Sequence, residues 1–175
     1  MENEKLYVSS QLKLEHWGPG EWVDEPDLFS FEHAGFHCFI CRIMGWDGLD
    51  NDHLYGGNLC GYVDILEGHP WYGKDVFDSG TFPDVEVHGG LTYGEVVEEK
   101  KYRIGFDCAH SYDIIPSMIK IKKQIMEGMI KDAKDLKGID ISNSPIFRES
   151  YRNFNYVMQQ TKSLAEQAKK AQDEE

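Results

Sequence analysis

The residues best suited to chemistry lie in two short segments between positions 85 and 110. One reads Val85-Glu-Val-His-Gly-Gly-Leu-Thr-Tyr93, and the other reads Gly105-Phe-Asp-Cys-Ala-His110. If both segments are strands, alternate side chains point to opposite faces, and pairing of the strands brings His88, Arg103 and Asp107 onto one polar face. The expected core side of the same strands carries Val85, Val87, Tyr102, Ile104 and Phe106.

Three kinds of chemistry fit this polar face. His88, Asp107 and His110 form a two-histidine, one-carboxylate set, which can bind a divalent metal ion and leave positions open for water and substrate. Alternatively, His88 is a general acid or base whose tautomer Asp107 fixes. In the third case the face binds an anionic or heteroaromatic ligand without catalysis. The residues expected in that binding role are His88, Gly89, Gly90, Thr92, Arg103, Asp107 and His110.

A purely structural interpretation of the same residues is also open. In it, His88 and His110 satisfy backbone groups at strand ends, and Asp107 caps a turn or pairs with Arg103. Because none of these spacings is specific to one reaction, the sequence assigns no catalytic residue and leaves open whether the protein is an enzyme.

A glycine- and proline-containing turn at Gly68–Lys74 presents further residues suited to ligand contact. Aromatic and cationic side chains on a loop serve contact more often than packing, so we expect His69, Tyr72 and Lys74 to bind ligand. The turn lacks the upstream glycine and the following Ser or Thr of a phosphate-binding loop. The chain also has no Gly-x-Ser-x-Gly elbow. The sequence therefore excludes P-loop nucleotide hydrolysis and gives no support to a serine hydrolase.

Several strings of the chain resemble one family. They are Gly61-Tyr-Val63, Gly68-His-Pro70, Tyr72-Gly-Lys74, Val87-His-Gly-Gly-Leu-Thr-Tyr93, Gly105-Phe-Asp-Cys-Ala-His110, Tyr151-Arg152 and Tyr156-Val157. Over about residues 58–165 the chain resembles a family of small uncharacterised proteins that recur in phages, prophages and plasmids. The resemblance implies an accessory viral or mobile-element product and no particular mechanism. The chain departs from the family pattern at Ile104, where a larger aromatic is expected, and in a Lys-rich helix around 117–137.

The elements that must position these residues divide the chain in two. Short runs between Gly, Pro and Asp predict mainly strands and loops over residues 1–110. The expected strands are Phe36–Met44, Leu59–Ile65, Asp84–Leu91 and Tyr102–Cys108, with Leu12–His16 as a weaker one. Helical spacing of apolar residues predicts helices over 113–137 and over 144–172, the second with Ser144 as N-cap and Pro145 in its first turn. We therefore expect a single α+β domain over residues 1–175, with an antiparallel sheet covered on one face by the two C-terminal helices.

The charge of the chain limits its partners. It has 18 basic and 31 acidic side chains, a net charge of −13, and residues 1–110 alone carry 7 basic and 21 acidic ones, a net of −14. Nucleic-acid binding depends on Lys and Arg that neutralise phosphates, so direct binding to DNA or RNA is disfavoured. The same negative surface could steer the protein toward a basic surface of another protein.

Composition and cysteine placement favour a folded protein of the host cytoplasm. Four Trp, nine Tyr and nine Phe supply a core, no apolar run approaches the ~20 residues of a membrane span, and the first residues do not form a signal peptide. Cys38 and Cys41 have zinc-knuckle spacing, but residues three apart on a strand point to opposite faces. We therefore expect these two cysteines, with Cys60 and Cys108, to be buried and reduced.

Three hypotheses about function follow. The first is a phage or mobile-element accessory protein that binds without catalysis, either sequestering a small nucleotide-like ligand or inhibiting a host factor such as a defence component. The second is a small metal-dependent hydrolase with a His/Asp/His site. The third is an acidic inhibitor of another protein that has no pocket. Partners are thus a small molecule or a host protein, with neither nucleic acid nor membrane, and we expect a monomer or homodimer. No cofactor is expected other than the divalent metal of the second hypothesis.

Overall fold

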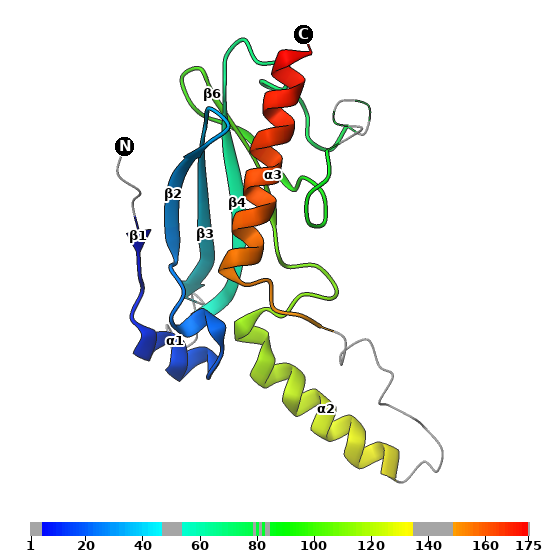
Figure 1. Ribbon diagram of the computed structural model, residues 1–175. Helices are drawn as coiled ribbons and strands as arrows, with labels where there is room; N and C mark the ends of the chain where they lie inside the picture. The colour runs from blue at the N-terminus through cyan, green and yellow to red at the C-terminus, as the bar shows by residue number, and fades with distance from the viewer. Residues whose placement is uncertain are drawn as a thin grey trace.

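The protein is an α+β fold built on a six-stranded antiparallel sheet (Figure 1). The computed structural model describes residues 5–46, 54–78, 80, 82, 85–134 and 149–174. The strands lie in the order β1-β2-β3-β4-β6-β5. Their bounds are Lys5–Leu6 (β1), Leu28–His33 (β2), Phe36–Trp46 (β3), Leu54–Leu66 (β4), Tyr93–Glu98 (β5) and Lys101–Asp107 (β6). The helices are Ser10–Trp17 (α1), Ile119–Lys134 (α2) and Phe154–Asp173 (α3), with 3-10 turns at Glu21–Val23 (η1) and Pro116–Met118 (η2).

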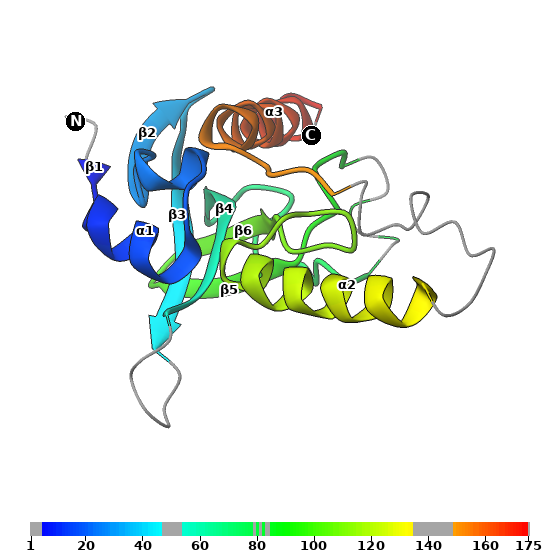
Figure 2. The ribbon, with the colours of Figure 1, turned by 90° about the horizontal axis from the view of Figure 1, so that it is seen from below.

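One face of the sheet is covered by α3, as the end-on view shows (Figure 2). Alternate residues of β4 and β6 face this helix, and the apolar core lies between the two layers. Among them, Val63 and Ile104 are fully buried and Phe106 is 1% exposed. Gly61 lies where the helix approaches most closely, because a side chain there would collide with Thr161 of α3. The expected core side of β6 is confirmed, and its other face carries Arg103 and Asp107.

The second helix does not cover the sheet, contrary to the prediction that both C-terminal helices do. Figure 1 shows α2 extending away from the end of the sheet. Ile119 packs against a small cluster around Trp17, Trp22 and Leu54, but Ile121 and Ile125 are 41% and 53% exposed. The helical spacing correctly predicted a helix here, since η2 and α2 run from Pro116 to Lys134. What the spacing could not show is that Ile121 and Ile125 on its apolar side are exposed.

The C-terminal helix begins at Phe154, later than predicted. Ser144 and Pro145 lie outside the described residues, while 149–153 are not helical. Ser150 instead pairs with the chain after β6, donating its N–H to the carbonyl of Tyr112 at 2.9 Å and accepting from the N–H of Ile114 at 3.1 Å. Asn153 is the N-cap, and its side chain accepts a hydrogen bond from the N–H of Tyr156 at 3.0 Å.

Two predicted strands are wrong. Leu12–His16 lies within α1, which Ser9 caps, because Lys13 and Trp17 are one turn apart and both point into the interior. Of Asp84–Leu91, the described residues 85–91 form no strand. The backbone turns at Gly89 and Gly90, where φ is +68° and +85°, values that favour glycine. The prediction also missed β1, β2 and β5.

The placement of the cysteines follows the alternation of side chains along a strand. Cys38 faces α3 and Cys41 faces the opposite side of β3, as expected for strand residues three apart. All four cysteines are free, and all but Cys41, which is partly exposed, are buried.

In the described part of the chain no helix combines the length and the apolar character needed to cross a membrane.

Candidate metal centre

His88, His110 and Asp113 place three metal-binding atoms together beside the N-terminal half of α3. Nε2 of His88 lies 2.7 Å from Oδ2 of Asp113, and Nδ1 of His110 lies 3.4 Å from the same oxygen. All three potential ligand atoms are within 4.8 Å of one another. The two imidazole rings meet edge to face with centroids 5.2 Å apart. This is a two-histidine, one-carboxylate set, the donor combination that binds divalent transition metals.

The Nδ1 atom of His110 has no hydrogen-bond partner although it is buried. It is the one buried side-chain nitrogen or oxygen without a partner in the part of the chain described. The 3.4 Å approach to Asp113 does not have the geometry of a hydrogen bond. Buried polar atoms are normally satisfied, and an exception indicates a missing partner such as an ion. In the tautomer that carries its proton on Nε2, the lone pair of this nitrogen is available for coordination.

Each of the other two ligand residues is held in place by a partner on its far side. Oη of Tyr156 lies 3.0 Å from Nδ1 of His88, and Nε of Arg152 donates to Oδ1 of Asp113 at 2.8 Å. The N–H of His110 donates to Oδ2 of Asp113 at 2.9 Å. Outer partners of this kind orient the ligands of metal sites and fix the histidine tautomer.

The carboxylate of Asp113 is ionised although it is almost completely buried. Burial raises its pKa, but the hydrogen bonds from His88, Arg152 and the His110 N–H outweigh this effect and leave the pKa below the ordinary value. The side chain is 1% exposed. A buried, charged oxygen is thus directed at the two histidines.

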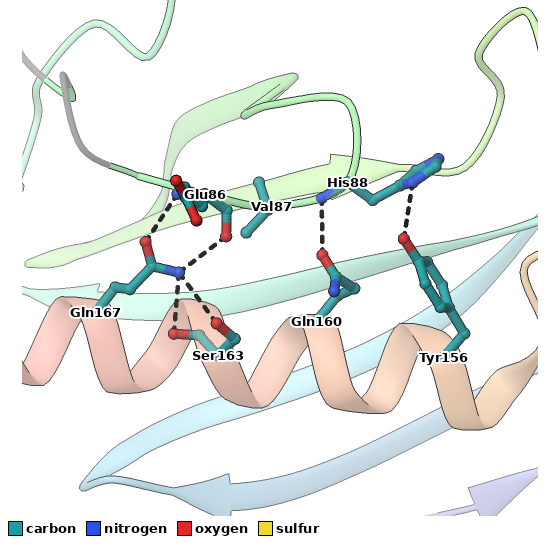
Figure 3. Close-up of a pocket in the computed structure, with 7 residues that line it drawn as sticks. All are labelled: Glu86, Val87, His88, Tyr156, Gln160, Ser163 and Gln167. Carbon is teal, nitrogen blue, oxygen red and sulfur yellow. Dashed lines mark hydrogen bonds between the residues drawn. The ribbon is translucent and has the colours of Figure 1, made fainter.

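Two glutamines of α3 position His88 (Figure 3). Oε1 of Gln160 accepts the N–H of His88 at 2.9 Å. Gln167 accepts the N–H of Glu86 at 2.8 Å and donates to its carbonyl at 2.9 Å. The segment around Val87 is therefore bound to the helix as an extended chain, with side-chain amides in place of a neighbouring strand.

Gly89 makes room for the second histidine. A Cβ on this residue would overlap the His110 ring, so only glycine allows the two segments to approach this closely. The adjacent Gly90 has open space around its Cα, and its N–H closes a turn on the carbonyl of Val87 at 3.0 Å. The glycine pair thus combines a turn with a close approach.

An open pocket of about 580 Å³ lies beside the cluster. His88 and Tyr156 form one end of its lining and Glu86 and Gln167 the other (Figure 3). The His88 side chain is 12% exposed and that of His110 is 36% exposed. The pocket therefore meets the cluster at His88.

Among the predicted ligand residues, the structure brings His88 and His110 together and leaves Asp107 apart. Asp107 ends β6, and its Oδ1 accepts the N–H of Ala109 at 2.9 Å, so it caps a turn as in the structural interpretation. Asp113 is the carboxylate of the cluster. Its signal in the sequence is the spacing His110-x-x-Asp113 within a turn, where residues three apart can share one side.

The predicted arginine also differs from the one at the cluster. Arg103 projects from the sheet face opposite α3, where its Nε donates to Oδ1 of Asp64 at 2.7 Å and its guanidinium lies 4.1 Å from the centre of the Phe39 ring. Arg152 is the arginine beside Asp113. In the sequence Arg152 was noted only as part of the Tyr151-Arg152 string. The fold brings it against the turn after β6, where it contacts Asp113.

The other predicted ligand residues lie outside the cluster. His69 is buried near the end of α3, with Nε2 2.9 Å from the carbonyl of Ala168. Twelve residues of helix, about 18 Å, separate this carbonyl from Tyr156. The Tyr72 ring packs on the core, Lys74 accepts the Tyr102 hydroxyl at its carbonyl, and Thr92 bonds to Gly105 through its N–H.

Comparison with known proteins identifies no relative: no family model, no curated protein and no solved structure matches the chain. The resemblance to phage and plasmid proteins therefore stays a prediction. Four of the strings on which it depends nevertheless meet at the cluster, through His88 and Gly89, through His110, through Arg152 and through Tyr156.

Proposed function

We propose that the protein is a metal-dependent hydrolase with one divalent transition-metal ion bound by His88, His110 and Asp113. The observation that carries the proposal is the unpaired, buried Nδ1 of His110, which faces the same oxygen that His88 contacts. Zinc bound to nitrogen and oxygen at about 2.0–2.2 Å has ligand atoms about 3.4 Å apart in tetrahedral geometry. The His110–Asp113 separation already has this value.

Binding would require the ligand atoms of His88 and Asp113 to move apart. Nε2 of His88 and Oδ2 of Asp113 are 2.7 Å apart, a hydrogen-bonding distance. A metal ion would replace the proton between them and widen the gap by about 0.7 Å to the separation typical of zinc ligands. In the His88 tautomer that would ligate through Nε2, Nδ1–H would donate to the Tyr156 hydroxyl, and Arg152 would hold the other oxygen of Asp113.

The donor set fits the hydrolytic chemistry of zinc sites that have two histidines and one carboxylate. Two imidazoles and one carboxylate suit Zn²⁺ and related transition metals better than Mg²⁺ or Ca²⁺, which prefer oxygen ligands. Three protein ligands leave one position for water, and bound Zn²⁺ lowers the pKa of that water to about 7. The open pocket beside His88 would hold the substrate.

A second candidate is the ligand-sequestering protein of a phage or mobile element. The feature that favours it is the pocket, which is open and polar. It lies against α3, whose Gln160 and Gln167 side chains already form hydrogen bonds with the backbone of His88 and Glu86. Such a protein would use the same cluster to bind a ligand and release it unchanged.

The test is metal stoichiometry followed by turnover. We expect native mass spectrometry to show one Zn²⁺ per chain, removed by EDTA and lost in His110→Ala. His33→Ala is the matched control, because His33 pairs with Glu166 on the surface outside the cluster. The zinc-loaded protein should hydrolyse activated p-nitrophenyl esters, and His110→Ala should not. Metal uptake without turnover would favour the sequestering protein, and a chain that takes up no metal would contradict the hydrolase.

A further inference from the structure

We infer that the ligand of this centre carries a phosphate group, which Arg152 and the metal ion bind together. The inference rests on the proposed function and names the chemical class of its substrate. It depends on the charge balance of the cluster and on the unused part of the Arg152 guanidinium.

The charge balance of the loaded centre favours an anion. Asp113 is the only carboxylate whose oxygen lies among the three ligand atoms, and its charge is offset by Arg152 at 2.8 Å. A divalent ion therefore leaves the centre with a net charge of about +2 once the Asp113–Arg152 pair is neutralised. This is a local exception in a chain whose net charge is −13. A phosphate monoester, with a charge close to −2 at neutral pH, balances such a centre.

Arg152 has the donors that a phosphate requires. Its Nε bonds to Asp113, and the terminal nitrogens of the guanidinium have no hydrogen bond to any described residue. The guanidinium lies 5.2 Å from the centre of the Tyr156 ring, and its side chain is 27% exposed. The charged group is therefore held in position by one nitrogen and one ring face while its two remaining nitrogens stay available. An arginine fork of this kind matches phosphate oxygens.

The opposite end of the pocket indicates the orientation of the ligand. Glu86 lies there beside Gln167, whereas His88 and Tyr156 lie at the cluster (Figure 3). A second anionic group near Glu86 would be repelled. The middle of the lining is uncharged and polar, with Gln160 and Ser163. We therefore expect a phosphate at the metal end and an uncharged, polar body along α3.

The experiment is a calorimetric titration of the zinc-loaded protein with inorganic phosphate. A parallel titration with acetate, a planar monoanion, provides the comparison. Phosphate should bind at least tenfold more tightly than acetate. In Arg152→Gln, which removes the charge, phosphate affinity should fall at least tenfold while one Zn²⁺ per chain is retained. Arg152→Lys keeps a charge for Asp113 but loses the fork, and its phosphate affinity should fall less. Arg103→Gln is the matched control, since Arg103 pairs with Asp64 at 2.7 Å and is similarly exposed; its affinity should be that of the wild type.

The outcomes separate this inference from the proposed function. If zinc binds but phosphate binds no better than acetate, or if Arg152→Gln and Arg152→Lys both bind phosphate as tightly as the wild type, the phosphate assignment is wrong and the metal site stands. If the wild-type chain takes up no zinc, the proposed function fails and this inference fails with it. Zinc content, measured before each titration, distinguishes the two results.

Discussion

The backbone N–H of His88 donates a hydrogen bond to the side chain of Gln160 at 2.9 Å. A helix side chain thus does for this segment what a neighbouring strand would do in a sheet. Gln167 repeats the arrangement at Glu86 with two hydrogen bonds. The position of His88 is consequently set by α3 and not by the sheet, and the same helix supplies Tyr156 to the far side of its ring.

Loss of the Gln160 contact should weaken metal binding without unfolding the protein. In Gln160→Ala the His88 N–H loses its acceptor, which costs about 1–3 kcal/mol for a buried donor and less where water can reach it. Metal affinity should fall about tenfold, as for other outer-shell changes. Competition with a zinc chelator measures the affinity. Gln160→Glu keeps an acceptor oxygen in place and should restore most of it; equal affinities for all three chains would show that the contact does not position His88.

Gly89 should be required for the cluster, and its neighbour provides the control. Gly89→Ala and Gly90→Ala both place a Cβ on a backbone with positive φ, so each should lose about 1 kcal/mol or more of stability. Only the first would also push against the His110 ring. We expect zinc binding to be lost in Gly89→Ala and retained in Gly90→Ala, as measured by native mass spectrometry. Equal retention of zinc by both variants would contradict the close approach of the two segments.

The sheet was more predictable than the site, for a physical reason. The inner strands β3, β4 and β6 carry apolar runs that the sequence displays, whereas the inner strand β2 was missed although it buries Phe29 and Phe31. The edge strand β5, Tyr93–Glu98, has two adjacent valines and therefore no clear alternation of apolar and polar residues. The segment before β5 has alternating apolar residues at Val85 and Val87, so it resembles a strand. Its backbone nevertheless forms hydrogen bonds with the side chains of Gln160 and Gln167 in α3 and not with a neighbouring strand.

The carboxylate of the cluster was missed for a related reason. Strand alternation predicted that Asp107 would share a face with His88, but His88 lies on a loop bound to α3 and Asp107 ends β6 on the other face of the sheet. Asp113 lies in a turn that follows β6, where no periodic pattern applies. Its place is fixed by contacts with His88 and His110 and with Arg152, which lies 39 residues away in the chain.

A buried ion network should stabilise the end of the sheet nearest α1. Lys13 has no exposed surface, and its Nζ lies 3.0 Å from Oδ2 of Asp27 and 3.0 Å from the carbonyl of Glu25. Lys13→Ala would leave the Asp27 carboxylate partly unpaired and open a cavity, so the free energy of unfolding should fall by about 3–5 kcal/mol. Urea denaturation measures it. Lys120→Ala removes an exposed lysine that contacts only a backbone carbonyl and should cost less than about 1 kcal/mol; similar losses in both variants would contradict the role of the network.

Acid should weaken the sheet through Asp64. Burial raises the pKa of this carboxyl, but hydrogen bonds from Arg103 and His37 and their charges outweigh burial and lower the pKa below the ordinary value of 3.8. In the unfolded chain the group therefore takes up a proton at higher pH than in the folded one, so protonation favours unfolding. The stabilisation is fully present above the unfolded pKa and is lost as the pH falls through the folded pKa. The stability difference between wild type and Asp64→Asn should accordingly be smaller below about pH 4 than at pH 5. Thermal unfolding of both chains across this range measures it, and a difference that does not change with pH would show that the Asp64 pair does not couple to folding.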